Sequence, residues 1–460
     1  MRDVTNQTFD EIAVGATATI ARTLTTTDVE ALALAAGDVE GFHLEGGSAD
    51  AGGRSAQGAA AIAIVAGLLN RRLPGPGTAI VATAFHYRGA CHAGDTLTAT
   101  VTAKARDARL HRIDFECRCT NQNGDVLVEG TATVDAPTAR IAYADVATPE
   151  MILRRNDAFG PVFKRCEGLP APVCAVVHPC DRDSLAGPIE AARRGLIVPV
   201  LVGPEAKIRA VARAEGIDIS AFRLVAVEHS HAAADAAVAL ARAGEVEALM
   251  KGSLHTDELM GAVVAAVTGL RTARRISHVF VLDVPTYPRL LLVTDAAINI
   301  FPTLEDKADI CRNAIELGHA VGIPQPKLAI LGAVEIVNPA MPSTIDAAAL
   351  CKMADRGQIT GGILDGPLAM DNAISPAAAL TKHIVSPVAG DADVLVVPDL
   401  EAGNILYKNL TYLARADAAG IVVGARVPVV LTSRSDTVRT RLASAALGAQ
   451  YSRWQRTPSG

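Results

Sequence analysis

The sequence contains eight cysteines in 460 residues but no C-x-x-C pair. Such a pair is common to redox motifs and to most zinc sites, so neither is indicated here. Scattered single cysteines are more typical of reduced thiols in a cytoplasm than of a disulfide framework. The cysteines stand at positions 91, 117, 119, 166, 174, 180, 311 and 351. We expect them to be core side chains rather than nucleophiles.

The sequence also lacks a long hydrophobic run and an excess of basic residues. Its longest apolar stretch, AAAIAIVAGLL at 59–69, is about half of the ~20 residues that span a membrane. We expect that stretch to form a helix buried on nearly every side. The first residues, MRDVTNQTFDEI, lack the apolar core of a signal peptide. With a net charge of −6, nucleic acid is not an expected partner, and we predict a cytoplasmic protein without membrane association.

Two patterns divide the chain. Up to residue 136, four runs at 78–87, 95–105, 110–120 and 126–136 alternate between apolar and polar residues, which predicts an antiparallel sheet. From residue 151, short apolar runs alternate with amphipathic helical stretches, which predicts a parallel, doubly wound α/β sheet. The predicted organisation is therefore an α+β domain at 1–136, a linker at 137–150 and an α/β domain at 151–460.

Asp38 and His43 directly follow the helical stretch TTDVEALALAAG. A carboxylate and an imidazole at this spacing could hold one water between them. Asp38 would act as a general base toward this water, and His43 would help to orient the water and to protonate the substrate. This is the chemistry of adding water to an activated alkene. The same pair also fits an aspartate at a helix end followed by an ordinary loop histidine.

The surroundings of this pair resemble the MaoC-like enoyl-CoA hydratases of the hotdog fold, whose signature is D-x-N-P-x-H. The resemblance covers about residues 8 to 135 and includes AQGAAAIAIVAGLLNRRLPGPGT and FHYRGACHAGDTLTATV. It places Asp38 and His43 on the catalytic positions, but Glu40 and Gly41 replace the asparagine and proline. The charge of Glu40 beside Asp38 could raise the pKa of one carboxyl group. A non-catalytic acyl-CoA-binding or oligomerising hotdog domain therefore stays an open alternative to an active hydratase.

Polar loops follow the apolar runs of the second domain. They include MKGSLHT at 250–256, VPDLEAGN at 397–404 and TSRSD at 432–436. Because ligands bind beyond the carboxyl ends of parallel strands, we expect these loops to lie at one edge of the sheet. Gly252 and Gly403 would let a ligand approach the backbone closely.

Each loop residue also has an ordinary structural explanation. Ser433 with Asp436 could cap the following helix, and Lys251 could be a solvated strand end. Asp399 and Asn404 could be turn formers. No compact spacing of acidic residues indicates a metal site, so none is expected.

Taken together, the loops resemble the phosphate acetyl- and butyryltransferase family over about residues 155 to 455. The motifs that carry the resemblance are VVHPCDRDSLAGPIEAARRGLIVPVLVGP, MKGSLHTDELM, ISHVFVLDVPTYPRLLLVTDAAINIFPTLEDKADICRNAIE, DGPLAMDNAIS, PDLEAGNILYKNLTYLA and GARVPVVLTSRSD. The resemblance implies a two-part α/β fold like that of isocitrate and isopropylmalate dehydrogenases. It implies a coenzyme A thioester and inorganic phosphate as substrates, no tightly bound cofactor, and a homo-oligomer.

The resemblance also implies roles for individual residues. Arg434 would bind phosphate oxygens with its planar guanidinium, and Ser433 would donate a hydrogen bond to the reacting thioester. The implied substrate-binding residues are Lys251, Gly252, His255, Thr256, Asp399, Asn404 and Asp436. The general base stays open, since only Asp436 is acidic near the Ser-Arg pair. TSRSD is closer to the butyryl-type branch, which favours short acyl chains beyond acetyl.

A different enzyme class is the main alternative for the second domain. A metal- and NAD-dependent hydroxyacid dehydrogenase would share the fold, but it needs a cluster of aspartates and a nucleotide-binding loop. The sequence shows no convincing example of either. We therefore predict a fused acyl-CoA enzyme.

Overall fold

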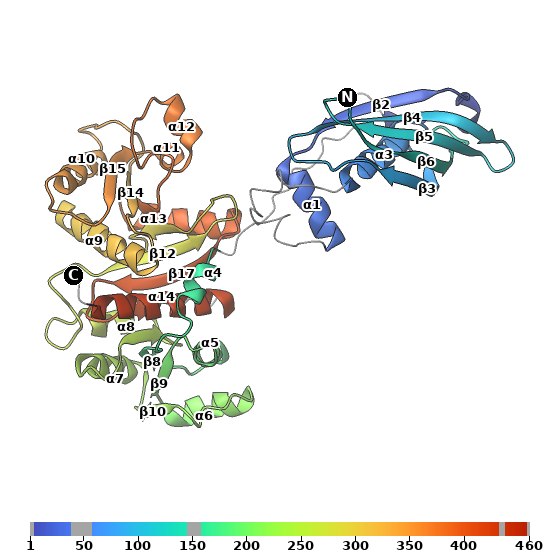
Figure 1. The fold of residues 1–460 in the computed structure, drawn as a ribbon. Coiled ribbons are helices and arrows are strands. Elements are labelled where there is room, and N and C mark those ends of the chain that lie inside the picture. The colour runs from blue at the N-terminus through green and yellow to red at the C-terminus, as the bar shows by residue number, and fades with distance from the viewer. Residues whose placement is uncertain (1–3, 38–57, 145–157, 432–437, 458–460) are drawn as a thin grey trace. The chain divides into compact units, whose positions relative to one another are not determined.

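A computed structural model describes residues 4–37, 58–144, 158–431 and 438–457. The chain separates into two compact units, Met1–Arg155 and Asn156–Gly460. Figure 1 shows the elements of each unit. Among the described helices, none is both long and apolar enough to cross a membrane.

The first unit contains a five-stranded antiparallel sheet in the order β2-β4-β5-β6-β3. The strands are β2 (Thr17–Thr23), β3 (Ala79–Tyr87), β4 (Thr96–Asp107), β5 (Arg112–Thr120) and β6 (Val126–Asp135). Alternate side chains of β4 and β5 are buried, as the apolar and polar alternation predicts. Cys117 and Cys119 therefore share the buried face. The predicted antiparallel sheet is confirmed.

In the described part of this unit, helices α1 and α3 accompany the sheet. A short strand pair, β1 (Val4–Thr5) with β7 (Ala142–Tyr143), brings together segments far apart in sequence. Helix α1 (Thr26–Ala36) begins at a capping box of Thr25 with Asp28 and ends at Gly37. Helix α3 (Ala59–Arg71) packs on the sheet through one face, which includes Val65 and Leu68. The expectation that this helix is buried on nearly every side is wrong, because the sheet covers only one side of it.

The second unit contains an 11-stranded sheet in the order β10-β9-β8-β11-β18-β17-β12-β13-β16-β14-β15. The first arm contains β8 (Val173–Val177), β9 (Val198–Gly203), β10 (Arg223–Ala226), β11 (Ala248–Lys251) and β18 (Val429–Val430), all parallel. The centre contains β17 (Asp417–Val423) and β12 (Ser277–Asp283). The second arm contains β13 (Leu291–Thr294), β14 (Lys327–Leu331), β15 (Ile363–Leu368) and β16 (Val394–Val396), again parallel.

The centre of the sheet reverses the strand direction. Strand β17 is antiparallel to both β18 and β12, and β12 is antiparallel to β13. Three antiparallel steps leave the two arms running in opposite directions. The prediction of a wholly parallel sheet is therefore wrong at the centre, although each arm is parallel as predicted. The likeness to isocitrate dehydrogenase stays a prediction.

Because of the reversal, the strands of the two arms end at opposite edges of the sheet. We call the edge where β8, β9, β11 and β18 end the Lys251 edge. We call the edge where β13, β14, β15 and β16 end the Asn299 edge. Strand β12 extends from one edge to the other, and its seven residues correspond to roughly 20 Å.

Helices lie on both faces of this sheet (Figure 1). They are α4 (Gly160–Lys164), α5 (Arg182–Arg193), α6 (Glu205–Ala214), α7 (Ser230–Arg242), α8 (Thr256–Val264), α9 (Leu304–Ala320), α10 (Pro342–Asp355), α11 (Met370–Ile374), α12 (Pro376–Thr381), α13 (Leu400–Lys408) and α14 (Val438–Arg456). Helix α14 contacts β17, α5 and α9, so it packs against both arms. Its fully buried Tyr451 donates a hydrogen bond to Glu316 of α9 at 3.2 Å.

Candidate active site at the Lys251 edge

The parallel pairing of β11 with β8 and β18 sets the geometry of this edge. Leu249 pairs with Val429 and Met250 with Val430, while Lys251 pairs with Val177 at the end of β8. The loops that follow these three strands therefore leave the sheet beside one another. This arrangement brings the 251–256 loop to the place where the chain leaves β18.

Ser433, Arg434 and Asp436 lie outside the described residues. The elements on either side of them are well defined: β18 ends at Val430, and α14 begins at Val438. The TSRSD motif thus connects a strand end at the Lys251 edge to the first turn of α14. Its predicted roles remain proposals.

The 251–256 loop is built close to the neighbouring backbone. Lys251 is only 8% exposed. A Cβ at Gly252 would stand 2.3 Å from the carbonyl oxygen of Val177 and 2.7 Å from that of His178. Two carbonyl groups that pack against this position therefore require a glycine, and the predicted contact of Gly252 with substrate stays a prediction.

Helices α5 and α8 are among those that begin at this edge. His255 is the N-cap residue of α8 and Thr256 is its first residue, while Asp181 caps α5 by accepting a hydrogen bond from the Ser184 backbone. The unpaired N–H groups of helix starts carry positive potential. His255 makes no capping hydrogen bond and is exposed, so its imidazole is available to solvent.

His178 and Ser253 form a hydrogen-bonded pair that the sequence did not reveal. Ser253 donates its hydroxyl proton to the backbone oxygen of His178 at 2.9 Å. The Oγ of Ser253 also lies 3.2 Å from His178 Nδ1, and it accepts from the backbone N–H of Cys180 at 3.2 Å. A hydroxyl has one proton to donate, so Nδ1 of His178 must be the donor to Oγ. The remaining lone pair of the neutral ring is then on Nε2.

The surroundings keep His178 neutral at physiological pH. Burial lowers the pKa of this imidazole below its ordinary value of 6.5. A hydrogen bond with the Ser253 backbone raises the pKa, and the charge of Lys207 lowers it. The carboxylates of Glu258 and Asp181 act to raise it. A neutral imidazole with a free Nε2 lone pair can accept a proton.

His178 also has an unusual backbone conformation. Its φ of 57° lies in the left-handed region, which residues other than glycine rarely adopt. Such conformations are frequent at functional sites. The sequence shows only a His-Pro dipeptide after the run APVCAVV, and the pairing with a serine 75 residues later becomes visible only in the fold.

The thiol of Cys180 also lies in the loop that follows β8 at this edge. Burial raises the pKa of its thiol to about 11, so the sulfur stays protonated at neutral pH. The expectation that no cysteine is a nucleophile stays a prediction.

Asp399 and Asn404 lie at the Asn299 edge. Asp399 follows β16, which runs opposite to β11, and its Oδ1 accepts a hydrogen bond from the Ala402 backbone as the N-cap of α13. Asn404 donates to the carbonyl oxygen of Ala296 at 3.4 Å. The expectation that the 397–404 loop shares one edge with Lys251 is therefore wrong, because the centre of the sheet reverses the strand direction.

Gly403 is also explained by packing. A Cβ at this position would stand 2.9 Å from the carbonyl oxygen of Asp295. Through Gly403 and Asn404, the 397–404 motif thus packs the start of α13 against residues 295–296, which follow β13. In the first unit, Asp38 and His43 lie outside the described residues, and α1 ends shortly before them.

Comparison with known proteins places the second unit in a family. The family model described as "Phosphate acetyl/butaryl transferase" matches residues 231–449. A phosphate acetyltransferase from Rhizobium meliloti is 66% identical over 279 residues, which is 61% of this chain and 88% of that protein. The chain belongs to the phosphate acetyl/butyryltransferase family.

Other members of the phosphate acetyl/butyryltransferase family support the same assignment. A phosphate butyryltransferase from Clostridium acetobutylicum is 42% identical over 60% of this chain and 91% of that protein. The crystal structure of a branched-chain phosphotransacylase from Enterococcus faecalis V583 is 30% identical, with a TM-score of 0.54. It covers 61% of this chain and 99% of the solved chain.

The structural role of Asp399 can be tested by Asp399→Ala. Because the change removes only a helix cap, we expect a loss of about 1 kcal/mol in the free energy of unfolding, measured in urea. The KM values for acyl-CoA and phosphate should stay unchanged. Ser375→Ala removes the equivalent cap of α12 and is the matched control. A KM raised several-fold at unchanged stability would return Asp399 to the substrate site.

Proposed function

We propose that residues 156–460 transfer a short acyl group between coenzyme A and inorganic phosphate. The observation that carries this proposal is the 66% identity with a phosphate acetyltransferase over 88% of its length. The Lys251 edge supports it, because Lys251 and the starts of α5 and α8 lie at the edge of the sheet where β18 also ends. These are the features that an anionic substrate requires.

Acetyl is the acyl group that we propose first. The chain is 66% identical to the Rhizobium meliloti acetyltransferase but 42% identical to the Clostridium acetobutylicum butyryltransferase. This difference outweighs the TSRSD motif, which by itself predicts a longer chain. A panel of acyl-CoA substrates decides between the two.

The reaction needs positioning and charge stabilisation more than covalent catalysis. A phosphate dianion oxygen attacks the thioester carbonyl carbon, the carbon–sulfur bond breaks, and the thiolate leaves with the electron pair. Arg434 binds the phosphate oxygens, and Ser433 donates to the oxygen on which negative charge develops. Lys251 and the starts of α5 and α8 add positive potential at the same edge. The thiolate finally requires one proton.

We propose that His178 moves that proton. In the reverse direction, Nε2 accepts the proton of the coenzyme A thiol, and the resulting thiolate attacks the acyl phosphate. Ser253 holds the ring with Nδ1 protonated, so that Nε2 is the basic atom. In the forward direction the hydrogen phosphate loses its proton as it forms the acyl phosphate, and the same nitrogen accepts that proton and passes it to the leaving sulfur. This assigns the acid–base role that Asp436 left open.

The transferase proposal is tested by thiol release. Purified protein with acetyl-, propionyl- and butyryl-CoA should release free thiol only when phosphate is present. Arg434→Ala should lower kcat/KM by about 10²-fold or more, since it removes a charged donor to the reacting phosphate. Arg434→Lys retains the charge without the planar fork and should recover part of the loss. Full activity in Arg434→Ala would remove this residue from the mechanism.

The role of His178 is tested by the pH dependence of the reverse reaction. A base that must be neutral gives a rate that falls as pH decreases through its pKa, which here lies below 6.5. His178→Asn should lower kcat and abolish this acidic limb, leaving a rate that rises with ionisation of the substrate thiol near ~8.5. Ser253→Ala removes the hydrogen bond that orients the His178 ring, and it should reduce kcat less than His178→Asn does. An acidic limb that persists in His178→Asn would rule out this assignment.

For the first unit we propose a hotdog domain that hydrates an enoyl-CoA thioester at Asp38 and His43. The five-stranded antiparallel sheet packed on α3 supports this proposal, together with the resemblance of the sequence to MaoC-like hydratases. Both units would then act on coenzyme A thioesters. The competing proposal is a domain that binds acyl-CoA or assembles the oligomer without catalysis, which the substitutions Glu40 and Gly41 favour.

Hydratase activity is tested with crotonyl-CoA. The wild-type protein should decrease the absorbance of the conjugated thioester as water adds to the double bond. Asp38→Asn removes the general base and should slow this reaction about 10²-fold or more, while thiol release with phosphate stays unchanged. If the wild-type protein leaves crotonyl-CoA intact but binds it, the non-catalytic proposal replaces this one.

A further inference from the structure

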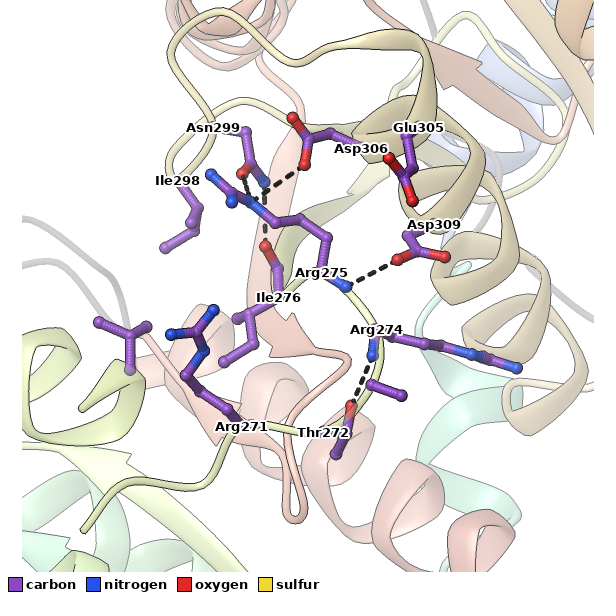
Figure 2. Close-up of a pocket in the computed structure, with 12 residues that line it drawn as sticks. Arg271, Thr272, Arg274, Arg275, Ile276, Ile298, Asn299, Glu305, Asp306 and Asp309 are labelled. Atoms are coloured by element: carbon purple, nitrogen blue, oxygen red, sulfur yellow. Dashed lines mark hydrogen bonds and ion pairs between the residues drawn. The ribbon is translucent and has the colours of Figure 1, made fainter. Parts of the chain in front are cut away.

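A pocket of about 500 Å³ opens at the Asn299 edge, about one strand length from the Lys251 edge (Figure 2). Its size is within the range of pockets that bind small molecules. Its walls come from the 271–276 loop, the segment after β13, and the first turns of α9. None of the residues assigned to the transfer reaction lines it.

The 271–276 loop is anchored to neighbouring segments by three contacts. The backbone of Arg271 forms an isolated antiparallel β-bridge with Ala425. Thr272 donates its hydroxyl proton to the carbonyl oxygen of Gly424 at 2.8 Å. The backbone N–H of Arg275 donates to Asp309 at 2.8 Å. Arginine side chains on this loop therefore extend from a fixed base, which reduces the entropy lost when they bind a ligand.

The three arginines of this loop differ in their partners. Arg274 extends away from the other two in Figure 2, and it pairs with Glu316. Arg275 donates through Nε to Asn299 Oδ1 at 2.6 Å and lies 3.5 Å from Asp306. Within the described parts of the chain, the guanidinium of Arg271 contacts no hydrogen-bond or ion-pair partner. Arg271 is therefore the group that a ligand anion would neutralise.

Asn299 fixes the orientation of Arg275. Its side chain is 3% exposed, and its Nδ2 donates to the carbonyl oxygen of Ile276 at 2.9 Å and to Asp295 at 2.6 Å. With both donors used, Oδ1 must face Arg275. This bond uses Nε of Arg275, so the two outer nitrogens of its guanidinium are left to contact a ligand in the pocket that Arg271 also lines.

The first turn of α9 adds acidic residues to the lining of the same pocket. The carboxylate of Asp306 accepts hydrogen bonds from Thr303 in the capping box of α9. The carboxylate of Asp309 accepts a hydrogen bond from Arg312. Glu305 has no partner in the described residues and is exposed at the pocket. Ile298 and Ile276 supply apolar surface to the same lining. A ligand that fits this lining has a phosphate group at one end and hydroxyl or amino donors at the other.

We propose that this pocket binds a phosphorylated nucleoside. Its phosphate contacts Arg271 and the outer nitrogens of Arg275, its sugar hydroxyls or base amine donate to Glu305, and its base packs on Ile298. Such a group has two sources, the adenosine 3′,5′-phosphate end of coenzyme A or a free nucleotide. Only the first source rests on the proposed transferase function.

Calorimetric titration of the full chain with adenosine 3′,5′-bisphosphate tests the site directly. Arg271→Ala should weaken binding about tenfold or more, because it removes a charged donor to phosphate. Glu305→Gln should weaken binding of the nucleotide but not of pyrophosphate, which has no group that donates to this wall. Arg356→Ala, at an exposed arginine outside the pocket, is the matched control and should change nothing.

Steady-state kinetics identify the source of the nucleotide. If Arg271→Ala raises KM for acetyl-CoA but not for acetyl-pantetheine, the pocket holds the distal end of the substrate. If KM is unchanged while nucleotide binding is lost, the ligand is a free nucleotide. Wild-type protein that binds no adenosine bisphosphate, or Arg271→Ala that binds it equally well, overturns the proposal whether or not transferase activity is found.

Discussion

The parallel pairing of β11 with β18 is the constraint on which the candidate site depends. These strands lie 180 residues apart in the sequence at the pair Met250 and Val430, yet their carboxyl ends are adjacent. The pairing is central in the sheet, flanked by β8 and β17, and α14 packs closely on β18 through Gly448. Because the strands cannot shift without disturbing these contacts, the 251–256 loop and the chain leaving β18 stay together.

The second constraint is the reversal of direction at β17 and β12. In a wholly parallel sheet, polar loops after every strand would meet at one edge. The reversal separates them instead into two sets about one strand length apart. It explains why Asp399 and Asn404 act as local structural groups while Lys251, His178 and Ser253 come together. It also leaves the arginine-lined pocket at the opposite edge from the proposed chemistry.

Much of the fold follows from local patterns. The alternation in β4 and β5 comes from a sheet with one buried face, and the strand–helix rhythm of residues 173–251 comes from parallel units covered by helices. Local patterns cannot give strand direction, however. The short runs of β12 and β17 are buried like their neighbours, so nothing in their composition distinguishes antiparallel from parallel pairing.

The sequence by itself determined the two-part organisation, the family of the second part, and the motifs proposed to carry its chemistry, because these depend on residue identity and spacing along the chain. Only the tertiary structure decided which motifs share an edge, since that depends on strand order and direction. It also decided the pairing of His178 with Ser253, whose hydrogen bonds join residues 75 positions apart and fix which ring nitrogen is basic. Contacts of that kind leave no periodic signal in a sequence, because either residue alone is an ordinary loop side chain.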